Sequence, residues 1–268
     1  VVMVSKIWIS RWFGIFLLLP SIISIFFGWW MAPTSFFIES QEAFQVPSTE
    51  FLMGTDDLGR DIFSGVVQGL RNSIFVSLGV TFISYTLGIA LGIISGLLGG
   101  ITDQLCLKFS EIIMILPRFL IIILATSFVG QGILILIIVL GLFSWTSIYR
   151  IIRSEILSLR TREYILAAKA LGSSVGRISI RHLFPAVFPT AAAIMPLSMC
   201  HAIMTEAGLS FLGLGDPEIV SIGYLISNSN QFLFSGWWIF TFPGLLLTMT
   251  VAGLMLVMFQ ENKDTDSL

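Results

Sequence analysis

Long runs without a charged residue constrain this chain more than any other feature of its sequence. Such runs cover residues 12–31, 72–102 and 119–149. Because about 20 helical residues cross a bilayer core of about 30 Å, each run is long enough to span a membrane. Only 11% of the residues are charged and the mean hydropathy is +0.95, whereas soluble domains carry about 25% charged residues. The sequence therefore predicts an all-α, multi-pass membrane protein.

We expect six transmembrane helices. They are predicted near residues 12–31, 73–97, 108–129, 132–150, 186–206 and 237–259. The third and fourth are separated because the run 119–149 is too long for one upright helix and is interrupted by Gly130-Gln131-Gly132. A five-span alternative would place these glycines at membrane depth and is less favoured.

Positive charge indicates the orientation. Seven of the fourteen Lys and Arg residues lie between residues 150 and 181, and the positive-inside rule places such a loop in the cytoplasm. With six spans, both the N- and C-termini are then cytoplasmic. We predict two regions: residues 1–71, an N-terminal span with an outer loop, and residues 72–268, a core transmembrane domain with a cytoplasmic loop at 150–185.

Gly88, Gly92 and Gly96 recur at four-residue steps in the second predicted span. A face of small residues lets two membrane helices approach closely. This face is therefore predicted to pack against a neighbouring helix rather than to line a substrate path.

The cytoplasmic loop contains a short helix-forming segment, residues 163–172. It is rich in Ala, Leu, Glu and Lys, which favour helices, and Gly172 is a typical C-terminal stop. Ala167, Ala168 and Leu171 share one helical face, where small side chains would let a partner surface approach closely. A solvated, basic juxtamembrane loop is the alternative interpretation.

This segment resembles the EAA loop of ABC-importer permeases, whose pattern is a Glu, two alanines, a glycine nine residues after the Glu, and a later proline. Glu163, Ala167, Ala168, Gly172 and Pro185 fill those positions. In that family the loop is a short coupling helix, between spans four and five, that docks on a cytoplasmic ATPase subunit. The resemblance assigns coupling to Glu163, Tyr164, Ala167, Ala168, Leu171, Gly172, His182 and Pro185.

Two further segments narrow the resemblance. Residues 54–61, Gly-Thr-Asp-Asp-Leu-Gly-Arg-Asp, are similar to a signature after the first outer loop of C-type permeases of the dipeptide, oligopeptide and nickel group. Residues 206–215 resemble the outer end of span five in the same group. The resemblance covers nearly the whole chain and implies the type I importer permease fold. For residues 54–61 we favour a structural role, with Arg60 and Asp57 spaced for an ion pair; contact with a binding protein is the alternative.

Energy is expected to come from other subunits. The sequence contains no Gly-x-x-x-x-Gly-Lys-Ser/Thr phosphate loop, so we expect the chain to bind no cofactor and to be no enzyme. The resemblance implies two ABC ATPase subunits that hold ATP and Mg²⁺, a second homologous permease and an extracytoplasmic solute-binding protein, all at a prokaryotic inner (cytoplasmic) membrane. The net charge of -2 argues against a nucleic-acid partner.

The resemblance implies a cargo of small peptides or of nickel or another metal chelate. Ionisable residues at membrane depth mark functional sites by default, so His201 and Glu206, together with Met204, form the predicted substrate path. His suits nickel, copper or zinc, and some nickel members of the group carry a His at about this place, whereas Glu206 is similar to the peptide members. Packing is the alternative role for a His among methionines.

Other function classes lack supporting motifs. A secondary transporter or channel without ATPase partners would not need the Ala-rich docking helix, and no inverted repeat is visible. An intramembrane hydrolase would have to use His182, His201, Glu206 or Ser210, and no His-Glu-x-x-His or Gly-x-Ser-x-Gly motif surrounds them.

Overall fold

The computed structural model describes residues 2–32, 36–40, 42–115 and 117–265, with side chains from Trp12 to Val257 apart from Arg118. Over these residues the chain is helical, and its β-type pairing is a single isolated bridge between Thr55 and Asp61. The elements are α1 (Val2–Met31), α2 (Ile62–Leu98), α3 (Gly100–Ile115), α4 (Arg118–Val129), α5 (Ile133–Leu159), α6 (Glu163–Ala170), α7 (Val175–Ile178), the π-helix η1 (Ser179–Leu183), α8 (Phe184–Phe211), α9 (Ile222–Ser229), the 3₁₀-helix η2 (Asn230–Phe232) and α10 (Trp237–Thr265).

The prediction of an all-α, multi-pass membrane protein is confirmed, and the six expected spans compare with five or six in the part of the chain that the structure describes. Five helical stretches within the described residues are long and apolar enough to cross a bilayer: Trp12–Met31, Ile62–Leu98, Ile133–Leu159, Val175–Phe211 and Trp237–Val257. The third span, predicted near 108–129, is not one straight helix. Helices α3 and α4 qualify only together, meet at a 90° bend, and give a sixth span if this bent pair crosses the bilayer as one broken span.

The predicted limits of spans two and five are too short. The helix of span two begins at Ile62 rather than near residue 73, and that of span five runs from Val175 to Phe211 rather than over 186–206. Charge-free runs mark the part of a helix that the bilayer covers, whereas hydrogen bonding continues the helix past polar residues such as Arg71 and Arg181. Helix ends are set by capping groups, and Asp61 provides one for α2. Its Oδ2 accepts hydrogen bonds from the backbone N–H and the hydroxyl of Ser64, at 2.9 and 2.6 Å.

Contacts divide the chain into two compact units. Unit 1 consists of Val1–Leu78, Thr126–Ile137 and Pro196–Leu268, and unit 2 consists of Gly79–Ala125 and Ile138–Met195. Unit 1 brings the expected N-terminal region 1–71 together with the last part of the chain, and α2 continues through residues 71 and 72 without a break.

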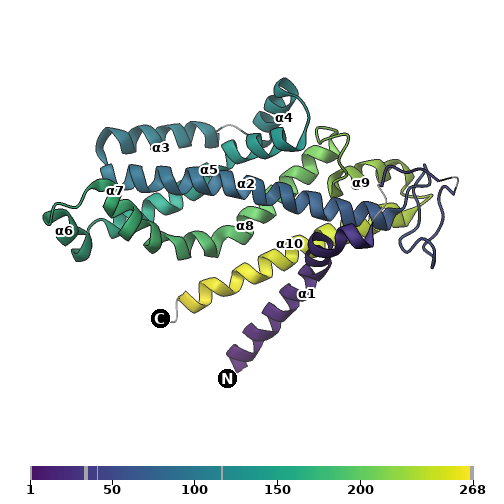
Figure 1. Cartoon of the computed structure of the whole chain (residues 1–268), viewed down its shortest axis with the longest axis horizontal. Coiled ribbons are helices and arrows are strands. Elements are labelled where there is room, and N and C mark those ends of the chain that lie inside the picture. The colour runs from purple at the N-terminus through teal and green to yellow at the C-terminus, as the bar shows by residue number, and fades with distance from the viewer. Residues whose placement is uncertain (1, 33–35, 41, 116, 266–268) are drawn as a thin grey trace. The chain divides into compact units, whose positions relative to one another are not determined.

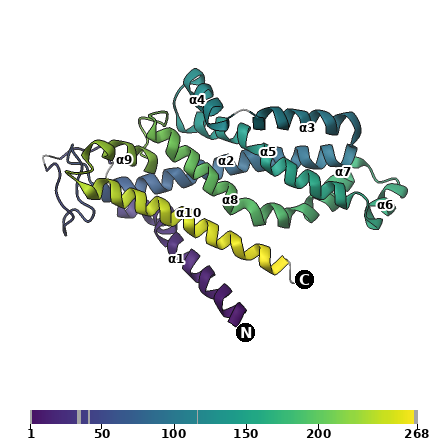
Figure 2. The ribbon, with the colours of Figure 1, turned by 180° about the vertical axis from the view of Figure 1, so that it is seen from behind.

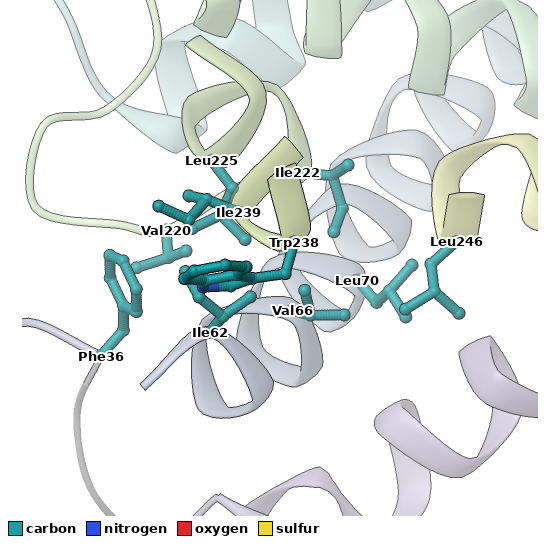
Figure 3. Packing of buried hydrophobic residues seen from close by; sticks show 10 residues of the cluster. All are labelled: Phe36, Ile62, Val66, Leu70, Val220, Ile222, Leu225, Trp238, Ile239 and Leu246. Carbon is teal, nitrogen blue, oxygen red and sulfur yellow. The ribbon is translucent and has the colours of Figure 1, made fainter. Parts of the chain in front are cut away.

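Unit 1 has a core built on the indole of Trp238 (Figure 3). Around it pack Phe36, Ile62, Val66, Leu70, Val220, Ile222, Leu225, Ile239 and Leu246, which come from α2, α9, α10 and the segments that precede α2 and α9. In the same unit α1 lies against α10, and the Ser21 and Thr250 hydroxyls are 2.6 Å apart. The start of α1 and the end of α10 lie on the same side of this helix pair (Figures 1 and 2).

Residues 54–61 form a compact turn that closes unit 1. Arg60 Nε donates to Asp56 Oδ2 at 2.6 Å, the Arg60 side chain is 8% exposed, and its guanidinium lies 4.7 Å from the centre of the Phe36 ring. Trp238 Nε1 donates to the Thr55 carbonyl at 3.0 Å. The main partner of Arg60 is therefore Asp56, and the expected partner Asp57 lies 3.8 Å away with a more exposed side chain. These contacts support the structural interpretation of the segment.

Gly54 is required where this turn meets Trp238. Its φ is +75°, a left-handed conformation that L residues rarely adopt. A Cβ at this position would lie 2.5 Å from the Gln45 carbonyl oxygen and 2.7 Å from Trp238 Nε1. A side chain here would therefore force the turn away from the core of unit 1.

Unit 2 is held together by the predicted glycine face. A Cβ on Gly88, Gly92 or Gly96 of α2 would lie 2.7 to 2.9 Å from a side-chain carbon of the isoleucine that faces it in α5, Ile148, Ile152 or Ile156 respectively. Three glycines on one helix thus receive three isoleucines of the other, each set at four-residue steps. The predicted close packing is confirmed, and α5 is the partner helix.

Candidate coupling helix and translocation residues

Helix α6 has a defined C-terminal stop. Gly172 has φ +78°, its N–H donates to the Lys169 carbonyl, and the Ser173 N–H donates to the Ala168 carbonyl, both at 3.0 Å. This pair of bonds is the Schellman arrangement, which ends a helix at a left-handed residue. The predicted stop at Gly172 is confirmed. Glu163 lies in the first turn, where its negative charge interacts favourably with the helix dipole.

One face of α6 is anchored in unit 2. The Ile165 side chain is fully buried among Ile152 and Ile156 of α5 and further residues of α2, α7, η1 and α8. Ala168, one turn after Ile165, is half-buried and packs against the same cluster. Of the face predicted for docking, Ala167 and Leu171 are exposed, whereas Ala168 is turned towards the core.

Helix α7 begins at Val175, after a four-residue connection from the end of α6, and continues into span five. Ser174 caps α7, because its hydroxyl accepts the Arg177 N–H at 3.3 Å. Helices α7, η1 and α8 then follow without a gap from Val175 to Phe211. Pro185 lies in the first turn of α8 and has no N–H to donate; just before it, the Phe184 N–H donates to the Ser179 carbonyl in the π-helical pattern.

Helices α6 and α7–α8 also touch through side chains. The ring centres of Tyr164 in α6 and His182 in η1 are 6.3 Å apart. Ile178 and Leu183 are buried in the same cluster as Ile165. Helix α6 is therefore fixed to the first part of span five, residues 175–183, by a core contact, a ring contact and a four-residue turn.

The segment from α6 to η1 exposes several large apolar side chains and several basic ones. Leu171 is 87% exposed and Ile180 is 75% exposed, with Val175 at 50%. The exposed cations of the same segment are Arg162, Lys169, Arg177 and Arg181. Large exposed apolar side chains gathered in one segment with polar groups are candidates for an interaction surface. We call Leu171, Val175 and Ile180, with these four cations, the docking surface.

The structure separates the three residues of the predicted substrate path. His201 and Met204 are three residues apart in α8 and both are exposed, Met204 at 56%. Glu206 is only 2% exposed and lies on a different side of the helix. Among the residues that the structure describes, no group of three or more His, Cys, Asp or Glu side chains could hold a metal ion.

Glu206 is the centre of a buried polar cluster in unit 1. Its two carboxyl oxygens accept hydrogen bonds from the hydroxyls of Ser73 in α2 and Ser210 in α8, each at 2.7 Å. Ser73 Oγ in turn accepts the Ile222 N–H at 3.4 Å, at the start of α9. Through Ser73, Glu206 joins α8 to α2 and to the start of α9, while Ser210 holds the carboxyl group from within α8.

The prediction from the sequence did not single out the residues that hold α6 in place, namely Ile165 and the cap Ser174. The predicted face of α6 consists of Ala167, Ala168 and Leu171 and does not include Ile165. The signal was available: Ile165 and Ala168 are three apart, as are residues on one helical face, and Ser174 before a helical run is a standard cap. Ser73, the partner of Glu206, carries no such signal, because the two residues are 133 positions apart.

The fold and this site define a multi-pass membrane permease subunit. Residues 88–261 match the family model of the binding-protein-dependent transport system inner membrane component. The chain belongs to this family, in the group that includes the peptide and nickel ABC permeases.

Similar proteins cover most of the chain. The oligopeptide transport system permease protein OppC of Bacillus subtilis is 34% identical over 212 residues, which are 79% of this chain and 70% of that protein. The dipeptide transport system permease protein DppC of the same organism is 32% identical over 241 residues, covering 89% and 75%. The nickel transport system permease protein NikC of Escherichia coli K12 is 30% identical over 254 residues, covering 94% and 92%.

Proposed function

We propose that this chain is one of two homologous permease subunits of an ATP-driven, binding-protein-dependent importer in a prokaryotic inner membrane. Two ATPase subunits hydrolyse ATP on the cytoplasmic side, and a solute-binding protein delivers the cargo from outside. Helix α6 couples the ATPases to the permease, and both chain termini lie in the cytoplasm. Family membership and the seven Lys and Arg residues between residues 150 and 181 support this arrangement.

The observation that carries the proposal is the combination of an exposed apolar surface with a rigid connection. Leu171 is 87% exposed, and desolvating an apolar group of this size against a partner contributes about 1.5–3 kcal/mol. A displacement of α6 moves Ile165 with it, and with Ile165 the inner end of α8, because both belong to one packed cluster. Packed cores switch between discrete arrangements rather than deforming continuously.

The cytoplasmic position of the docking surface can be measured directly. In Leu171→Cys, with Cys106 and Cys200 replaced by Ser, we expect a membrane-impermeant maleimide to label inside-out vesicles and not intact spheroplasts. Addition of the ATPase subunits to the inside-out vesicles should protect the thiol, because the docked surface excludes the reagent. The same chain without a cysteine at position 171 is the control. Labelling from the outer face would contradict the proposal.

The cargo we propose is a small peptide or a nickel or metal-chelate complex, the classes named in the similar permeases. The exposed side of α8 with His201 and Met204 contributes this chain's part of the translocation path. Glu206 supports the path indirectly, since it is buried and held by serines.

His201 distinguishes the two cargo classes. We expect His201→Ala to lower nickel uptake by the complete importer, because imidazole is a good nickel ligand, and to leave peptide uptake unchanged. Thr205→Ala, one turn further along α8, is the matched control, since its hydroxyl bonds to the His201 carbonyl within the helix at 2.7 Å. Equal nickel uptake by His201→Ala and the parent chain would remove His201 from the path.

A further inference from the structure

The inner end of α5 contacts several elements of unit 2 at once. Ile152 and Ile156 pack against the glycine face of α2 and against Ile165 of α6. Glu155 accepts a hydrogen bond from Thr190 of α8 at 3.0 Å. Arg153, which follows Ile152 in the sequence, reaches a fourth element, α3.

Arg153 forms a two-bond ion pair with Asp103. Its Nε and Nη2 donate to the two carboxyl oxygens of Asp103 at 2.5 and 2.6 Å. Ser95 of α2 donates to the same carboxyl group at 2.7 Å, and the Tyr149 hydroxyl lies 3.0 Å from Ser95 Oγ. Two-bond arginine–carboxylate pairs fix orientation as well as distance. Both side chains are mostly buried, at 20% and 16% exposure.

Apolar packing holds residues 100–105 of α3 only weakly, whereas Cys106 and Leu107 pack, partly buried, against the cluster of Ile113, Trp145 and Tyr149. The buried residues of this helix are Ser110 and Ile113, both in its second half. Ile101, Leu105 and Phe109 are exposed by 58 to 76%. The helix is entered from α2 through Gly99 and Gly100, which both have positive φ. The Asp103 contact is therefore the principal tie between the start of α3 and the rest of unit 2.

We infer that Asp103 and Arg153 are a positioning pair, which makes the start of α3 follow α5 when the coupling helix moves. The inference rests on the proposed function, because the movement it transmits starts at α6. Arg153 is next in sequence to the residues that receive Ile165, so a shift of α6 reaches Arg153 through the same turns of α5. Without the pair, α3 would keep the packing contacts that begin at Cys106.

A role in folding alone makes a different prediction from a role in positioning. Removing one partner leaves a largely buried charge without compensation, which destabilises any fold. Replacing both partners by neutral groups removes that penalty and is often nearly neutral for stability. A double neutral variant therefore folds in either case, and only a positioning role predicts that its α3 no longer follows α5.

The test uses the complete importer in nanodiscs, with nitroxide labels at Gln104→Cys in α3 and Ser154→Cys in α5 and with Cys106 and Cys200 replaced by Ser. Both label sites are exposed. The inter-label distance is measured without nucleotide and after trapping with ATP and vanadate. The variant is Asp103→Asn with Arg153→Gln, and the control is Glu111→Gln with Lys108→Gln, which removes one charge of each sign from the exposed side of α3.

We expect the distance to stay constant between the two states in the parent chain and the control, and to change by about 2 Å or more in the double variant. ATPase stimulation by the loaded binding protein should fall on the order of two- to tenfold in that variant alone. A constant distance in the double variant, or a changing one in the parent chain, overturns the inference.

Two further variants complete the test: one replaces the double variant if it fails to assemble, and the other tests the proposed function separately. If the double variant does not assemble, Arg153→Lys takes its place, because lysine keeps the charge but cannot make the two-bond contact, and the same outcomes apply. The Gly172→Pro variant decides the proposed function separately. If Gly172→Pro uncouples the importer while the double variant behaves like the parent chain, the positioning role fails and the coupling role of α6 stands.

Discussion

Gly172→Pro is expected to abolish the stimulation of ATPase activity by the loaded binding protein, while the protein still inserts and assembles. Proline fixes φ near -65° and has no N–H, whereas Gly172 has φ +78° and donates to the Lys169 carbonyl. Both features of the helix stop are lost together. Helix α6 has only 8 residues. A proline that its backbone cannot accommodate costs about 3 kcal/mol or more, and this is enough to move Leu171 out of its place in the docking surface.

Asparagine at the same position is the matched control. Asn is the residue that most often replaces glycine at a left-handed helix stop, and a Cβ at Gly172 would have no neighbour within 4 Å. Gly172→Asn should therefore keep most of the stimulated activity. The measurement is ATP turnover of the reconstituted importer with and without loaded binding protein. Full stimulation in Gly172→Pro would rule out α6 as the coupling element.

Asp56→Ala is expected to destabilise unit 1 by about 3–5 kcal/mol, because it leaves the buried Arg60 without its counter-ion. Burial lowers the pKa of Arg60, but the charge of Asp56 and the hydrogen bonds to Asp56 and Tyr224 raise this pKa by more, so that it lies above its ordinary value. Arg60 therefore stays charged in the folded protein. Asp56 also accepts the backbone N–H groups of Leu58 and Arg60, at 3.0 and 2.8 Å.

The neighbouring acid provides the control for this prediction. The Asp57 side chain is 29% exposed, and its carboxyl oxygen lies 3.8 Å from Arg60. Weak, partly exposed pairs contribute at most about 1 kcal/mol, so Asp57→Ala should stay close to the parent chain. Thermal unfolding in nanodiscs and protease cleavage within residues 36–61 measure both variants. Equal destabilisation by the two substitutions would show that the Asp56–Arg60 pair is not the principal tie of this turn.

Local features of the sequence predicted the parts of the fold that depend on neighbours in the chain. The apolar runs located the spans because crossing a bilayer needs a fixed length of helix. Gly172 predicted the end of α6, since a left-handed helix stop is a property of one residue and the turn before it. The steps of Gly88, Gly92 and Gly96 predicted a close helix contact, although not the identity of the partner helix.

Pairings between distant residues had no comparable signal. Glu206 looked like a path residue because an acid in an apolar span is rare, yet its buried place depends on Ser73, 133 positions away. Asp103 and Arg153, 50 positions apart, are adjacent only because α2 and α5 pack through their glycine–isoleucine contact.

The sequence by itself determined the class of protein, the approximate places of most spans and the short helix that ends at Gly172, because chain-local hydrophobicity and backbone preference set these features. Only the tertiary structure decided which side of that helix is buried by Ile165, which acid pairs with Arg60, and which of the three path residues is exposed. Each of these features depends on contacts with residues that are distant in the sequence, and such contacts form only when the helices pack together.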